Sequence, residues 1–225
     1  MKEYWTLTPE ENHETLDTAT EHLQSLLIDA IERQLFGDMP LCTFLSGGLD
    51  SSLISAICAK KFRESGQKLS TFSVDYENND QYFRSGKFQP ESDNSYIEHM
   101  RRFIDSNHTE TVLNPDQLLD GLYEAVAARD LPGMADVDSS LLVFCKEIRK
   151  HVTVALSGEC ADEIFGGYPW YRDPAVRSFD GFPWAQNTQF RASVLNMDAI
   201  KPERALEFVA DLYAQTLHES DILPN

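Results

Sequence analysis

Basic residues are scarce in this chain of 225 residues: 19 Lys and Arg stand against 37 Asp and Glu, and the formal net charge is -18. Nucleic-acid backbones are bound through clustered Lys and Arg, so a nucleic-acid partner is disfavoured. The same charge argues against binding to an anionic membrane surface. A small anionic ligand stays compatible with it if backbone N–H groups or a metal ion hold that ligand.

Long apolar runs and cysteines are also rare. No uncharged apolar run reaches the roughly 18 residues of a membrane span, and the opening MKEYWTLTPEEN lacks a signal-peptide pattern. The four cysteines, Cys42, Cys58, Cys145 and Cys160, form no CxxC pair. We therefore expect free thiols in a cytoplasmic protein, and neither a zinc nor an iron–sulfur site.

The hydrophobic residues, 42% of the chain, suffice for a substantial core, and their spacing predicts alternating elements. Helical periods occur over about 16–36, 53–66, 95–107, 115–130, 138–151 and 202–217. Short apolar or β-branched runs predict buried strands over 41–45, 68–76, 108–114 and 152–156. We expect Asp138 to be an N-cap and residues 77–94 to form a surface loop. This alternation predicts a three-layer α/β fold with a mostly parallel sheet.

The stretch FLSGGLDSS, residues 44–52, runs from the first predicted strand into a helix. Glycines 47 and 48 remove Cβ atoms, so backbone N–H groups and the helix N-terminus can approach an anion closely. The hydroxyls of Ser46, Ser51 and Ser52 add donors for phosphate oxygens. Asp50 would repel a bare phosphate, so its presence implies a bridging cation, most simply Mg²⁺. The alternative is a plain serine-capped turn that carries an acidic residue by chance.

A second Ser-Gly turn, LSGECADEIFGGY (residues 156–168), follows the fourth predicted strand. Ligands of open parallel sheets bind at the carboxyl ends of strands, so the two turns are expected to meet. Asp162 could share the cation with Asp50, and Glu159 could act as a general base or position an attacking amine. The alternative is a solvated acidic start of a helix; the two turns together favour the ligand site.

These motifs identify a family. FLSGGLDSS resembles the pyrophosphate loop of the ATP pyrophosphatases, which make AMP and pyrophosphate. With ALSGECADEIFGGYPWY, and with DLPGMADVDSS ahead of it, the chain resembles the synthetase domain of glutamine-hydrolysing asparagine synthetases over about residues 16–172. The resemblance implies an adenine nucleotide alpha hydrolase-like fold, with a lead segment over 1–15, an ATP pyrophosphatase-like synthetase domain over 16–170 and an incomplete helical extension over 171–225.

The resemblance also implies the chemistry. The domain would bind Mg·ATP, adenylate the side-chain carboxylate of aspartate, and let ammonia displace AMP. Glu159 and Asp50 are the implied catalytic residues, Glu159 for the proton of the amine. Asp50 and Asp162 are the implied Mg²⁺ ligands. The residues implied to bind ATP and pyrophosphate are Leu45, Ser46, Gly47, Gly48, Asp50, Ser51, Ser52, Val74, Ser157 and Gly158.

Departures from the family pattern keep other functions open. The family begins with a glutaminase domain that opens on a catalytic cysteine and continues well past this end, so we expect a piece cut from a longer protein, without glutamine hydrolysis. A relative that adenylates another carboxylate, as in β-lactam-forming or peptide-modifying enzymes, is one alternative. A tRNA-modifying pyrophosphatase is disfavoured by the charge and the absence of CxxC. A fragment that binds nucleotide without turnover, and a homodimer, also stay open.

Overall fold

The computed structural model describes Tyr4 and residues 11–37, 39–86, 91–131, 133–194, 196 and 201–220. Thr15–Glu159 form one compact unit, and the described residues from Cys160 onward belong to a second.

The first unit is built on a sheet of four parallel strands in the order β3-β2-β1-β4. The strands are β1 (Leu41–Phe44), β2 (Ser70–Tyr76), β3 (Asn107–Leu113) and β4 (Val154–Leu156). The chain builds outward from β1 through β2 to β3 and then returns, so that β4 pairs with the other side of β1. The switch in strand order therefore falls between β1 and β4, which is where open α/β sheets bind ligands.

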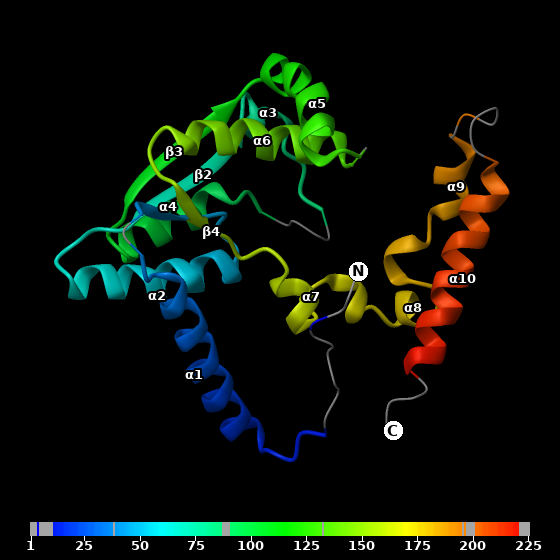
Figure 1. Ribbon diagram of the computed structural model, residues 1–225, viewed down its shortest axis with the longest axis horizontal. Helices are drawn as coiled ribbons and strands as arrows, with labels where there is room; N and C mark the ends of the chain where they lie inside the picture. Colours follow the sequence, from blue (N-terminus) through cyan, green and yellow to red (C-terminus); the bar gives the residue numbers. More distant parts are fainter. Residues whose placement is uncertain are drawn as a thin grey trace. The chain divides into compact units, whose positions relative to one another are not determined.

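Helices cover both faces of this sheet (Figure 1). They are α1 (Leu16–Gln34), α2 (Leu49–Glu64), α3 (Asn79–Tyr82), α4 (Asn94–Phe103), α5 (Pro115–Arg129) and α6 (Ala135–Arg149). On one face Cys42 and Phe72 pack with Phe144 and Ile148 of α6. On the other face Cys58 of α2 packs with Leu69 and Ile104, and Ile31 of α1 packs against that cluster. The three-layer, parallel α/β fold predicted from the sequence is confirmed.

The predicted N-cap role of Asp138 is wrong. Helix α6 begins three residues earlier, with Met134 as its N-cap, and Asp138 lies inside the helix. Its carboxylate accepts a hydrogen bond of 2.5 Å from Nη1 of Arg129 at the end of α5, so it joins two helices instead of capping one. The predicted loop over 77–94 also differs, because it contains the short helix α3 and the first residue of α4.

The second unit contains helices and no strand over its described residues. It comprises α7 (Ala161–Phe165), η1 (Pro169–Tyr171), α8 (Pro174–Arg177), η2 (Pro183–Ala185), α9 (Thr188–Ser193) and α10 (Pro202–Ser220). Aromatic rings pack within it: Tyr168 stacks on Trp170 with centroids 4.2 Å apart, and Phe182 meets Tyr213 of α10 edge-on at 5.2 Å. No described helix in either unit combines the length and the apolar character needed to cross a membrane.

Candidate functional site

The SGGLDSS turn links β1 to α2 and is held in shape by its own hydroxyls. Gly48 is the N-cap of α2. The buried Ser51 hydroxyl donates to the Gly48 carbonyl at 3.2 Å, accepts from the Ser46 N–H at 3.2 Å, and lies 2.9 Å from the Ser46 hydroxyl. Ser51 thus stabilises the turn through hydrogen bonds within it. Ser46 and Gly48 are exposed, and Gly47, Asp50 and Ser52 are half-buried.

Gly47 lets the turn pack against the start of α4. Its φ is +82°, a left-handed conformation that glycine adopts without strain. A Cβ at this position would lie 2.9 Å from the Asp93 carbonyl oxygen and 3.0 Å from Cβ of Tyr96. The residues at the start of α4 therefore form one wall of the turn, and nothing larger than glycine fits between them.

The two Ser-Gly turns meet, as the sequence predicts. A Cβ built on Gly158 would lie 3.0 Å from Cβ of Asp50 and 3.1 Å from the Ser51 backbone nitrogen. Pairing of β1 with β4 brings the two strand ends together. Next to Gly158, the Ser157 hydroxyl accepts the Glu159 N–H at 3.1 Å, and both of these side chains are exposed. A backbone cradle and exposed polar groups thus gather at the switch point of the sheet.

Leu45 and Val74, the residues expected to line the adenine or ribose, sit near the ends of adjacent strands. The Leu45 side chain is 1% exposed, and its N–H donates to the Phe72 carbonyl at 2.8 Å. Leu45 is therefore enclosed in the core at the end of β1. Val74 is half-buried and packs on the Cys42–Phe144 side of the core.

Asp162 lies on α7, in the second unit. There the Gly167 N–H donates to its carbonyl at 3.0 Å, and the neighbouring Glu163 accepts a 2.8 Å hydrogen bond from the Tyr168 hydroxyl. Within the described parts of the chain, no three or more His, Cys, Asp or Glu side chains gather as a metal centre would require. The cation shared between Asp50 and Asp162 stays a prediction.

One residue near the turns escaped the sequence reasoning. Asp75, at the end of β2, accepts three hydrogen bonds: the Tyr76 N–H at 2.8 Å and Asn79 Nδ2 at 2.7 Å bind Oδ1, and Asn94 Nδ2 at 3.0 Å binds Oδ2. The sequence does hold a signal for this residue: it is acidic, lies at the end of a predicted strand, and is followed by the asparagine-rich ENND.

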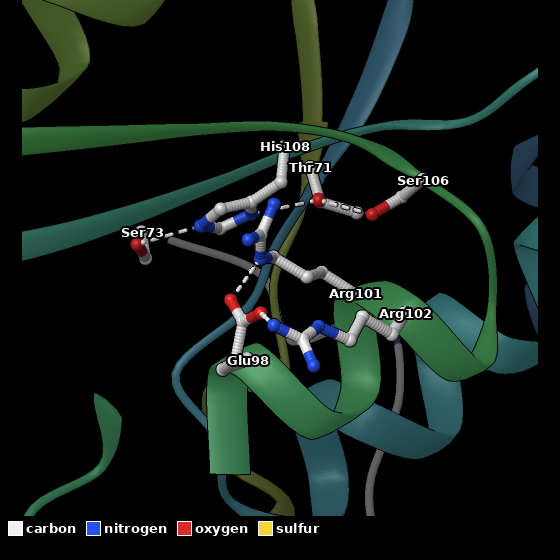
Figure 2. Close-up of polar contacts among 7 residues, drawn as sticks. All are labelled: Thr71, Ser73, Glu98, Arg101, Arg102, Ser106 and His108. Atoms are coloured by element: carbon white, nitrogen blue, oxygen red, sulfur yellow. Dashed lines mark hydrogen bonds and ion pairs between the residues drawn. The ribbon is translucent and has the colours of Figure 1, made fainter. Parts of the chain in front are cut away.

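His108 belongs to a polar network in the amino-terminal halves of β2 and β3, away from the two Ser-Gly turns (Figure 2). Its Nδ1 lies 2.9 Å from the Thr71 hydroxyl and its Nε2 3.1 Å from the Ser73 hydroxyl. Glu98 of α4 pairs with Arg101 and Arg102 beside it. Burial, and then the charge of Arg101, lower the His108 pKa, while Glu98 opposes this. This arrangement gives His108 a structural role between β2 and β3.

Comparison with known proteins identifies the family. A model of the asparagine synthase family, described as "Asparagine synthase", matches residues 22–222. The chain belongs to the asparagine synthase family. The match spans both strand-end turns, so the family assignment made from three short motifs is confirmed.

Proteins named as asparagine synthetases match most of the chain. "Asparagine synthetase [glutamine-hydrolyzing] 3" of Bacillus subtilis is 48% identical over 98% of this chain, and "Asparagine synthetase [glutamine-hydrolyzing] 1" of the same organism is 33% identical over 83%. The mouse asparagine synthetase is 28% identical over 69%. The chain spans 36%, 27% and 27% of the lengths of these three relatives.

Proposed function

We propose that this chain is the synthetase part of a glutamine-hydrolysing asparagine synthetase. It would bind Mg·ATP, transfer AMP to the side-chain carboxylate of aspartate, and let ammonia displace the AMP to give asparagine. The observation that carries this proposal is the contact of Gly158 with Asp50 and Ser51 at the switch point of the sheet. Family membership supports the same reaction.

The turn residues Ser46 to Ser52 suit a pyrophosphate group. Gly47 and Gly158 let the turns pack closely against their neighbours, and Gly48 is the N-cap of α2. The first N–H groups of a helix lack partners within that helix and point outward, where they attract anions. The exposed Ser46 and half-buried Ser52 would add hydroxyl donors, whereas Ser51 would keep the turn in its binding shape.

Asp50 and Asp162 are the proposed Mg²⁺ ligands. A hard cation takes oxygen ligands, and the half-buried Asp50 carboxylate in the first turn of α2 is of that kind. Without a cation, this carboxylate would repel the phosphates that the turn suits. When bound, Mg²⁺ would neutralise phosphate charge and polarise the reacting phosphoryl group.

The two chemical steps balance without a further reactant. An oxygen of the aspartate side-chain carboxylate forms a bond to the α-phosphorus of ATP, and the bond from that phosphorus to the pyrophosphate oxygen breaks. The ammonia nitrogen then attacks the acyl carbon, loses a proton, and AMP departs with the bonding electron pair. We assign the proton transfer to the exposed Glu159 carboxylate, which follows the Gly158 turn directly.

The nucleoside would lie beside the pyrophosphate site. Leu45 and Ser157 directly follow β1 and β4, and Val74 lies in the second half of β2, the strand on the other side of β1. We propose that they contact the adenine and ribose.

The free state of all four cysteines supports a cytoplasmic setting. We also propose two partners: a glutaminase domain that supplies ammonia, and a second copy of the chain, with which it forms a homodimer.

Pyrophosphate release from Mg·ATP tests this function. The chain is incubated with ammonium chloride and either aspartate or other carboxylic acids, and amide products are identified by mass spectrometry. Aspartate-dependent release with asparagine as product supports the proposal. Release with a different acid would instead establish a relative that adenylates that acid. ATP binding without release would establish a nucleotide-binding fragment and contradict turnover by this chain.

A further inference from the structure

We infer that Asp75 is a positioning residue for the proposed pyrophosphate turn, acting through Asn94 and the first turn of α4. The inference rests on the proposed function, because it concerns how tightly the same turn holds Mg·ATP. Neither residue belongs to the FLSGGLDSS or the LSGECADEIFGGY stretch.

The first link joins the carboxyl end of β2 to the start of α4. Asp75 ends the apolar part of β2, and its Oδ2 accepts the Asn94 side-chain amide at 3.0 Å. Asn94 is the first residue of α4. Across the long connection between these elements, this hydrogen bond fixes the start of α4 to the carboxyl end of β2.

The second link joins α4 to the turn. The Asp93 carbonyl accepts the Ile97 N–H at 2.9 Å, which fixes its direction in the first turn of α4. That same oxygen and the Tyr96 Cβ stand where a Gly47 side chain would be. The backbone of the pyrophosphate turn therefore rests on residues that Asp75 holds through Asn94.

Asp75 also makes contacts that do not lead to the turn. Its Oδ1 accepts Asn79 Nδ2 at 2.7 Å and the Tyr76 N–H at 2.8 Å. Asn79 begins α3, whereas the three atoms nearest to a Cβ on Gly47 belong to Asp93, Tyr96 and Ile97. Two asparagines thus donate to one carboxylate, and only Asn94 adjoins the wall of the turn.

The two asparagines allow a matched test, because each donates one amide hydrogen bond to Asp75. Asn94→Ala and Asn79→Ala each remove one amide hydrogen bond to Asp75, so both should lower the thermal midpoint by a similar amount. Titration calorimetry with Mg·ATP should separate them. Because a hydrogen bond contributes about 1 kcal/mol, Asn94→Ala should weaken binding about fivefold, and Asn79→Ala less than twofold.

Variants of Asp75 provide the second measurement. Asp75→Ala should bind Mg·ATP as weakly as Asn94→Ala. Asp75→Asn should restore most of the affinity, since the Asn94 amide can turn and accept from the new amide. Equal Mg·ATP affinities of wild type, Asn94→Ala and Asn79→Ala would overturn the inference and leave the proposed function standing. A wild-type chain that binds no Mg·ATP would overturn both.

Discussion

Gly158 lies directly against Asp50: a Cβ on the glycine would be 3.0 Å from the Cβ of the aspartate. The two residues come from turns after β4 and β1, which the chain places side by side by reversing its strand order. Asp50 and the Ser51 backbone thus fill the space in which a side chain at position 158 would lie. It also ties the position of the proposed metal ligand to a residue of the second motif.

Gly158→Ala should therefore disturb the site more than the fold. The added methyl group must displace Asp50 or the Ser51 nitrogen, and such overpacking costs about 1–3 kcal/mol. We expect Mg·ATP affinity to fall about tenfold, as measured by calorimetry. Gly86→Ala is the control, because a Cβ there meets no atom within 4 Å. Equal affinities of the two variants would contradict the assigned contact.

Gly47→Ala should combine backbone strain with a steric clash. Gly47 and Gly66 both have left-handed φ angles, +82° and +73°, but a Cβ on Gly66 meets nothing within 4 Å. Gly66→Ala thus carries only the conformational cost of about 1–2 kcal/mol. Gly47→Ala should be less stable by a further 1–3 kcal/mol or so in urea unfolding, and should lose Mg·ATP binding. The same unfolding midpoint in both variants would show that α4 does not confine the turn.

His108 should make stability depend on pH. Its pKa is lowered in the fold, so the unfolded chain, with a pKa near 6.5, binds more protons in the window just below that value. The free energy of unfolding should consequently fall as the pH drops from 7 towards 5. His108→Gln removes the titrating group, and its unfolding curve should lose this part of the decline. Parallel pH profiles for the variant and wild type would refute the role of burial.

The cysteines should differ in reactivity. Burial raises the pKa of the Cys42 and Cys58 thiols to about 12, and it also raises that of Cys145. Because thiolates are the reactive species, an alkylating reagent at pH 8 should label the exposed Cys160 first and Cys145 more slowly. Cys42 and Cys58 should react only after unfolding. Peptide mapping showing early label on either buried cysteine would contradict the described core.

The sequence predicted the layers of the fold because their signals are local. β-branched runs and helical periods located the four strands and the helices flanking them, and the Ser-Gly turns marked two strand ends. The meeting of these turns follows from a general property of parallel sheets, so it too could be predicted. Residue-level roles at the turns, such as Ser46 as a phosphate donor, stay predictions.

Other features depend on contacts that exist only in the folded chain. Asp138 looked like an N-cap because aspartate favours that position, but Arg129 of another helix binds it. The bracing of the turn by Ser51 needs the folded loop, in which its hydroxyl faces the Gly48 carbonyl. The Asp75–Asn94 bond crosses a long, polar connection with no period to read. Such contacts are set by tertiary packing and leave no pattern in a single sequence.

Mg²⁺-dependent ATP binding by Asp50→Asn is the most direct test of the site. Asp116→Asn is the matched control, because Asp116 also lies in the first turn of a helix that follows a strand, α5. In calorimetric titrations with and without Mg²⁺, the wild type and Asp116→Asn should bind Mg·ATP equally. Asp50→Asn should bind it at least tenfold more weakly and gain nothing from Mg²⁺. Wild-type affinity in Asp50→Asn would contradict the account, since the aspartate would then have no part in holding the cation.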